Sequence, residues 1–280
     1  MGLFNFINYD KEGPGVSKSE PEKKSFVRFF ELYFRNFWKL MTLSLYHMLL
    51  SIPVITSGLA AIGSANVTRN LSRGKHSFGA QDFFDTIKKN WKQGLGIGIL
   101  NLLITAVLVF DIWYFFGTEG TMGTIFIGIS LFLLFVFTVM KYYMPLLIIT
   151  FSLRTKQIYK NCFKFVFINL PRNLLILVVE MLCAAVAVLA TLYGGGIGVA
   201  LVSVLAIAVY PAFRSFLIQF TIFDCIRKYM IDPYYAEHPE ADIQKRLDLG
   251  LSVPEEYMPK YDDDYGVFDD ERMLPQTEEE

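Results

Sequence analysis

The sequence predicts an all-α fold, a polytopic helical membrane bundle with about six membrane segments in three hairpins and short amphipathic helices at the interface. Hydrophobic residues make up 53% of the 280 residues and charged residues only 19%, whereas soluble domains carry about 25% charged residues. Long stretches hold no charge, as between Glu119 and Lys141 and between Glu180 and Arg214. Apolar stretches longer than about 18 residues can cross a hydrocarbon layer of about 30 Å.

The first hairpin is predicted by the uncharged stretch 40–68. It is too long for one ordinary crossing, and Pro53 divides it because proline interrupts the helical hydrogen-bond ladder. Basic residues flank both ends, so the positive-inside rule places both flanks in the cytoplasm. We expect one helix at 38–52 and a return helix at 54–70. The small residues of the return helix favour close packing, and it either spans fully or is re-entrant.

Four further apolar stretches predict the other two hairpins. They lie at about 94–116, 123–150, 172–192 and 197–222. The turns inside these two hairpins contain no Lys or Arg, whereas the segments between hairpins are basic. By the positive-inside rule the turns lie outside. The sequence therefore predicts a multi-pass protein of the cell membrane with both termini in the cytoplasm.

Three amphipathic stretches precede the hairpins, at 26–37, 81–92 and 155–169. In the first, aromatic residues recur at the spacing of one helical face. They are Phe26, Phe29, Phe30, Tyr33, Phe34 and Phe37. Such a face suits a helix lying at the membrane interface, or one that packs on the bundle itself. The sequence leaves both alternatives open.

The charges divide the chain into two parts of opposite sign. Residues 1–231 hold 22 Lys and Arg against 11 Asp and Glu, whereas residues 232–280 hold 4 against 16. We expect a polar lead-in at 1–24, a membrane domain at 25–231 and an acidic cytoplasmic tail at 232–280. The tail is too polar and aperiodic to bury a core.

Three charges fall within the predicted crossings and form a candidate intramembrane polar cluster: Lys141, Glu180 and Arg214. At about 1.5 Å per residue, each lies about 12–15 Å from the cytoplasmic end of its helix. A charge at that depth costs roughly 2.5–3.5 kcal/mol unless it is compensated. Glu180 therefore pairs with Lys141 or with Arg214, as a structural bridge or as part of a polar cavity that opens to the cytoplasm.

No catalytic, cofactor-binding or metal-ligating residue is expected. The sequence contains no phosphate-binding loop, no HExxH and no GxSxG. Its cysteines, Cys162, Cys183 and Cys225, lie outside metal-ligand spacing and are interpreted as isolated thiols. His47, in an apolar stretch, is interpreted as a hydrogen-bonded core residue. We expect neither an enzyme nor a cofactor.

A group of motifs is similar to the YesL family of membrane proteins of unknown function. These motifs are MGLFNF at the start, FWKL and SIPVITSGLAAIG in the first hairpin, DFFDTIKKNWKQG before the next crossing, and YYMPLLIITF and LPRNLL further on. The resemblance covers roughly residues 25–225. It implies a multi-helix membrane protein often encoded beside sugar-import ABC transporters or glycan-degrading enzymes, and it implies no site residues.

Two functions remain open at this point. The first is a non-catalytic accessory or scaffold component associated with carbohydrate uptake. Its expected partners are the lipid bilayer and subunits of ABC sugar transporters, with no nucleic acid. The second is a small solute transporter or channel with a cytoplasm-facing polar cavity around Glu180, Lys141 and Arg214.

Overall fold

The computed structural model describes residues 25–118 and 120–238, and these residues form helices without any strand. The lead-in at 1–24 and most of the acidic tail lie outside the described residues. The helices are α1 (Ser25–Arg35), α2 (Phe37–Ser51), α3 (Ser57–Ser72), α4 (Ala80–Phe116), α5 (Thr121–Thr150), α6 (Thr155–Ile168), α7 (Leu170–Tyr193), α8 (Gly195–Ala208), α9 (Tyr210–Ile226) and α10 (Asp232–Glu237), with a π-helical turn at Arg227–Ile231.

Contacts divide the chain into two units, Met1–Phe223 and Asp224–Glu280. The described part of the second unit ends at His238 and is helical. In it, the Nε atom of Arg227 lies 3.4 Å from Oδ1 of Asp232, which links the π-helical turn to α10. The first unit holds most of the buried residues and the features discussed below.

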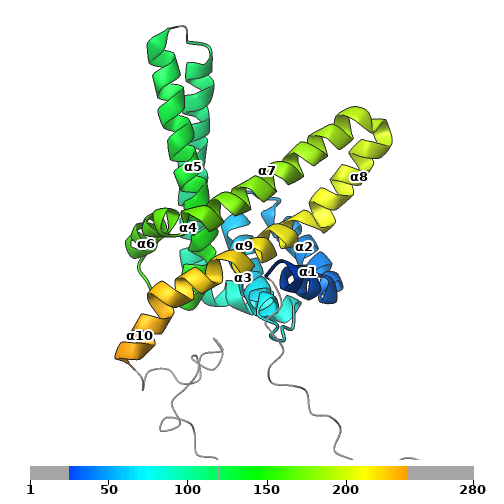
Figure 1. Ribbon diagram of the computed structural model, residues 1–280, viewed down its shortest axis with the longest axis vertical. Coiled ribbons are helices and arrows are strands. Elements are labelled where there is room, and N and C mark those ends of the chain that lie inside the picture. Colours follow the sequence, from blue (N-terminus) through cyan, green and yellow to red (C-terminus); the bar gives the residue numbers. More distant parts are fainter. Residues whose placement is uncertain (1–24, 119, 239–280) are drawn as a thin grey trace, which may run out of the picture. The chain divides into compact units, whose positions relative to one another are not determined.

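Two helical hairpins carry the longest apolar surfaces of the first unit. In Figure 1, α4 runs beside α5, and α7 runs beside α8. The apolar windows of α4, α5 and α7 are long enough to cross a membrane, yet few of their residues are buried by the protein. Apolar surface of this extent is rarely left to water, so the length and composition of these helices make them candidate membrane spans.

The layout of six crossings in three hairpins is not supported. Three helices, α4, α5 and α7, are long and apolar enough to span, and a fourth span results if the bent pair α8–α9 crosses as one unit. The helices of the first predicted hairpin, α2 and α3, are too short to span, because they have only 15 and 16 residues. At about 1.5 Å per residue they are shorter than the hydrocarbon core.

Helix α3 is instead a central packing element. Ala60, Ala65 and Val67 are fully enclosed, and its glycines allow close approach to α4. A Cβ atom on Gly58 would lie 2.6 Å from the Cα of Gly98, so the two backbones touch there. Small residues in a helix favour this kind of contact.

Helix α4 combines two elements that were predicted separately. The amphipathic stretch 81–92 and the crossing 94–116 form one helix of 37 residues. Its start is fixed by Asp82, whose Oδ2 accepts hydrogen bonds from Ser77 Oγ (2.6 Å) and the Phe78 amide (3.0 Å). Gly79 has a φ of +60°, a conformation that favours glycine. A carboxylate near the first turn also complements the helix dipole.

The amphipathic stretch 155–169 forms α6, as expected. Ile158, Cys162 and Phe165 are buried, while the lysines of the same helix are exposed.

The aromatic face of α1 is partly packed on the bundle and partly exposed. Phe29 is buried, and its ring lies 5.3 Å from the rings of Phe216 and Phe220 in α9; other rings of the same face remain exposed.

Candidate functional site: a polar cavity between the helices

A cavity of about 260 Å³ lies among α2, α3, α5, α8 and α9. Its volume is several times the ~30 Å³ that one water molecule occupies in the liquid, so a small solute fits. Its wall combines polar and charged side chains with small apolar ones. The polar members are His47, Ser51, Lys141, Tyr142, Tyr210, Arg214, Ser215 and Gln219.

Two prolines on the cavity wall lie in the two helices that carry the charges. Pro145 lies inside α5, and it has no N–H to donate to the carbonyl of Lys141. Pro211 lies at the start of α9, where α8 and α9 meet at a 50° bend. At the bend, Ser44 Oγ donates to the Val209 carbonyl (3.3 Å) and accepts from the Ala212 amide (3.0 Å). These bonds hold the break in place.

Arg214 and Glu180 form an ion pair next to the cavity. The Nε atom of Arg214 lies 2.7 Å from Oε1 of Glu180, with side chains 39% and 16% exposed. The hydroxyl of Tyr142 donates to the other carboxylate oxygen at 2.8 Å. The guanidinium carbon of Arg214 also lies 5.6 Å from the centre of the Tyr142 ring, over its face. The carboxylate of Glu180 is therefore balanced by one cation and one neutral donor.

Lys141 is the second cation on the wall, and it is not balanced in this way. Its ammonium lies 3.5 Å from Thr105 Oγ1 and 5.5 Å from the centre of the Phe137 ring. Among residues 25–118 and 120–238, no carboxylate forms an ion pair with it. The described wall thus has two cations and one carboxylate nearby, a local excess of one positive charge.

Two further polar side chains of the wall, His47 and Ser215, are bonded to side chains of α3. His47 Nδ1 lies 2.8 Å from Ser64 Oγ, and Ser215 Oγ lies 2.9 Å from Thr68 Oγ1. Gln219 differs, because it is 2% exposed and its Oε1 has no hydrogen-bond partner among the described residues. This oxygen is enclosed rather than open to the cavity, and a buried acceptor without a partner costs about 1–3 kcal/mol.

His47 is neutral at physiological pH. It lies in α2, outside the candidate spans. Burial, with a smaller contribution from the positive charge of Arg214, lowers the pKa of His47 to about 4. Its ring therefore adds no positive charge to the wall above about pH 5.

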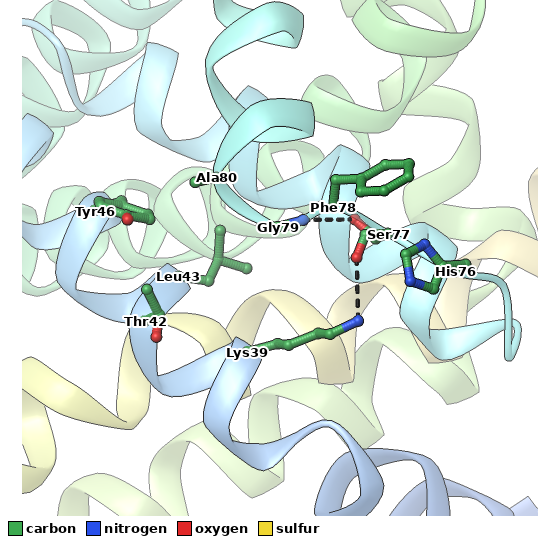
Figure 2. Close-up of a pocket in the computed structure, with 9 residues that line it drawn as sticks. All are labelled: Lys39, Thr42, Leu43, Tyr46, His76, Ser77, Phe78, Gly79 and Ala80. Atoms are coloured by element: carbon green, nitrogen blue, oxygen red, sulfur yellow. Dashed lines mark hydrogen bonds between the residues drawn. The ribbon is translucent and has the colours of Figure 1, made fainter.

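A second hollow, of about 490 Å³, lies where the loop before α4 meets α2. Figure 2 shows Lys39 reaching across to Ser77, with its Nζ 3.2 Å from the Ser77 carbonyl, and the Gly79 amide donating to Ser77 Oγ at 3.3 Å. Ser77 in turn donates to Asp82. Lys39 thus has a hydrogen-bond acceptor at this hollow, which makes the hollow a weaker candidate site than the polar cavity.

The three residues of the predicted polar cluster thus come together, although they are far apart in the sequence. Of the two pairings left open, the structure forms Glu180–Arg214. Sequence reasoning missed the contributions of Tyr142 and Gln219. Gln219 had a visible signal, since it is an amide within an apolar helix, whereas Tyr142 resembled the other aromatic residues around it.

The comparisons with known proteins assign no activity. A family model described as "Protein of unknown function, DUF624" matches residues 40–112. This part of the chain covers most of α2, all of α3 and most of α4 but none of the charged cavity residues. No curated protein and no solved structure matches the chain.

Proposed function

We propose that this protein is a non-catalytic integral membrane protein that binds a small anionic solute in the polar cavity. The observation that carries the proposal is Lys141, a half-buried cation on the cavity wall with no carboxylate partner among the described residues. Inside a membrane, such a charge costs roughly 2.5–3.5 kcal/mol. An anionic group bound beside Lys141 would offset this cost.

The break between α8 and α9 supports an anion rather than a cation. Tyr210 and Pro211, the first residues of α9, line the cavity. The amino-terminal end of a helix carries a partial positive charge. Membrane transporters commonly direct the ends of broken helices at the anionic groups of their substrates. The charge of Arg214, one turn further along α9, has the same sign.

The cations of the wall favour an oxyanion over a bare halide. The ammonium of Lys141 and the guanidinium of Arg214 both donate and neither accepts. The oxygens of a carboxylate or a phosphate can accept from both cations at once.

The orientation in the membrane is part of the proposal. The segment between α5 and α7 carries Arg154, Lys156, Lys160 and Lys164, whereas the turn at Gly194–Gly196 carries no charge. By the positive-inside rule the basic segment lies in the cytoplasm. On this orientation Lys141 and Glu180 lie about 14–15 Å from the cytoplasmic ends of α5 and α7.

An accessory role in carbohydrate uptake rests on the sequence resemblance alone and remains a prediction. Purification of the protein from its native membranes tests it separately. Co-purification of ABC transporter subunits would support an accessory role, with the solute site serving to sense or hold a ligand. A chain that purifies without them would favour a solute-binding protein that acts alone.

Anion-dependent stability tests the proposed function. The purified full-length protein is heated in a neutral detergent with sodium acetate, lactate, phosphate or chloride at equal ionic strength. A ligand that binds only the folded state stabilises it by RT ln(1 + [L]/Kd). We expect saturable stabilisation by at least one oxyanion, and its loss in Lys141→Met.

The matched control is Lys89→Met, which removes an exposed lysine of α4 away from the cavity. It should keep the response to the oxyanion. If no oxyanion exceeds chloride, or if both variants respond like the unmodified protein, the proposed function is wrong.

A further inference from the structure

An apolar groove of about 620 Å³ lies between α7 and α8, in addition to the polar cavity and the hollow at Ser77. Its walls are formed by Leu182 and Val186 of α7 and by Leu201 and Leu205 of α8, with Phe213 at one end. These four aliphatic side chains are between 47% and 65% exposed in the protein. Hydrocarbon must cover them in the native environment.

The apolar groove and the polar cavity share part of their walls. Tyr210 and Ala206 line both. Tyr210 stands at the bend between α8 and α9, one helical turn before Arg214. A ligand that fills the cavity can therefore extend past Tyr210 into the groove without leaving the protein surface.

The groove is closed at its far end. Near the turn of the hairpin, a Cβ atom on Gly198 would overlap the carbonyl of Ala190, so the two helices meet backbone to backbone. A helix of a partner protein is about 10 Å wide with its side chains, and it could not lie along the groove up to this contact. A flexible hydrocarbon chain could.

We propose that the ligand is a single-chain anionic amphiphile, with its anionic head between Lys141 and Arg214 and its apolar chain in the groove between α7 and α8. This inference rests on the proposed function and adds the chemical class of the ligand. The head offsets the excess positive charge of the cavity. The chain covers the aliphatic walls in place of bilayer lipid, so the charged head, and not the chain, distinguishes this ligand from the surrounding hydrocarbon.

Photolabelling tests this inference. The full-length protein, in nanodiscs of zwitterionic phosphatidylcholine, is irradiated with a ten-carbon carboxylate that carries a diazirine near the end of its chain. Labelled residues are mapped by mass spectrometry. We expect saturable labelling of α7 and α8 within the groove. An excess of decanoate should compete for it, whereas decanol, which has the chain without the charge, should not.

Three variants separate the head from the chain. Lys141→Met should reduce the groove labelling about tenfold, since losing one charged contact of about 1.4 kcal/mol has that effect, while Lys89→Met should not. Ala187→Trp fills the groove, because Ala187 lines it and not the cavity. Ala187→Trp should abolish the groove labelling but keep the stabilisation by the small oxyanion. That stabilisation would also show that the variant folds.

The outcomes distinguish this inference from the proposed function. Labelling spread over the lipid-facing sides of α4, α5 and α7, without competition by decanoate, would overturn the amphiphile even if a small oxyanion still stabilises the protein. Competition by phosphatidylglycerol in the nanodisc as strong as that by decanoate would also overturn it, because the occupant would then be a two-chain lipid. If neither the oxyanions nor the probe bind, both proposals fall.

Discussion

Arg214 Nε lies 2.7 Å from Glu180 Oε1, although the two residues belong to different helices and charges are rare within apolar helices. The pair leaves Lys141 without a carboxylate among the described residues, which gives the cavity its positive character. The contact also links α7 to α9. It therefore has a structural and an electrostatic consequence, and mutation can separate them.

Loss of the carboxylate should destabilise the protein. In Glu180→Gln the guanidinium of Arg214 keeps its place but loses its counter-ion, at a cost of about 1–3 kcal/mol. Glu180→Gln combined with Arg214→Gln should recover much of this loss, as contacting residues couple in a double-mutant cycle. Thermal unfolding in detergent of the unmodified protein, the two single variants and the double variant measures the coupling. Additive losses in the double variant would show that the pair contributes nothing.

Acidification should weaken the fold through His47. Burial lowers the folded-state pKa of His47 to about 4, against about 6.5 in an unfolded chain. The folded protein therefore binds fewer protons between these values. The contribution to stability is complete above about pH 6.5 and is lost as the pH falls towards 4. His47→Asn should flatten the decline of melting temperature over this range. A decline equally steep in both proteins would refute the assignment.

The contact between α3 and α4 should not tolerate side chains. A Cβ atom on Gly98 would lie 3.0 Å from the Cα of Gly58, so Gly98→Ala should cost about 1–3 kcal/mol by overpacking. Gly96→Ala is the matched control, since nothing lies within 4 Å of its added Cβ. It should be neutral or stabilising by up to about 1 kcal/mol, because alanine is the better helix former. Equal melting temperatures for the two variants would contradict the close contact.

A topology with four crossings and one with six place the turn between α2 and α3 on different sides of the membrane. If α2 and α3 do not span, a cysteine at Val54 should not react with a membrane-impermeant thiol reagent added outside intact cells. A cysteine at Gly196, in the turn between α7 and α8, should react. On the same orientation a cysteine at Leu153 should react only after permeabilisation. External labelling at Val54 would restore the first predicted hairpin.

The sequence predicted the helical class and several helix ends well. The crossings at 123–150 and 172–192 correspond to α5 and α7 within two residues at each end. Uninterrupted apolar stretches between glycine-containing turns mark such helices clearly. The sequence did not show that α4 runs on through the amphipathic stretch 81–92, because a change from amphipathic to apolar character does not require a break in the backbone.

The number of crossings was the main error, and it has a physical cause. Lack of charge in 40–68 reflects burial inside the protein as readily as burial in lipid. Ala60, Ile62 and Val67 are enclosed by other helices, and hydropathy alone does not distinguish these environments. The break in the last predicted crossing was visible in principle, since Pro211 lies inside 197–222 and proline bends or ends a helix.

The candidate site was only partly predictable. An unusual charge in an apolar stretch must be compensated, so Glu180 could be assigned a cationic partner from the sequence. Choosing between Lys141 and Arg214 required the relative rotation of three helices, which the proline at 145 and the bend at Pro211 alter. For the same reason the neighbouring hydrogen bond from Tyr142 could not be foreseen.

The binding of an anion at Lys141 can be observed in a crystal structure of the full-length protein grown with sodium bromide, a heavy halide that takes the place of the ligand's anionic group beside the cations. The anomalous signal of bromide locates the ion. We predict a peak in the cavity, in contact with the Lys141 ammonium and near Arg214, which is absent from crystals of Lys141→Met. An empty cavity in which Lys141 turns to pair with Glu180, or bromide found only on the exposed lysines of α6, would contradict the proposal.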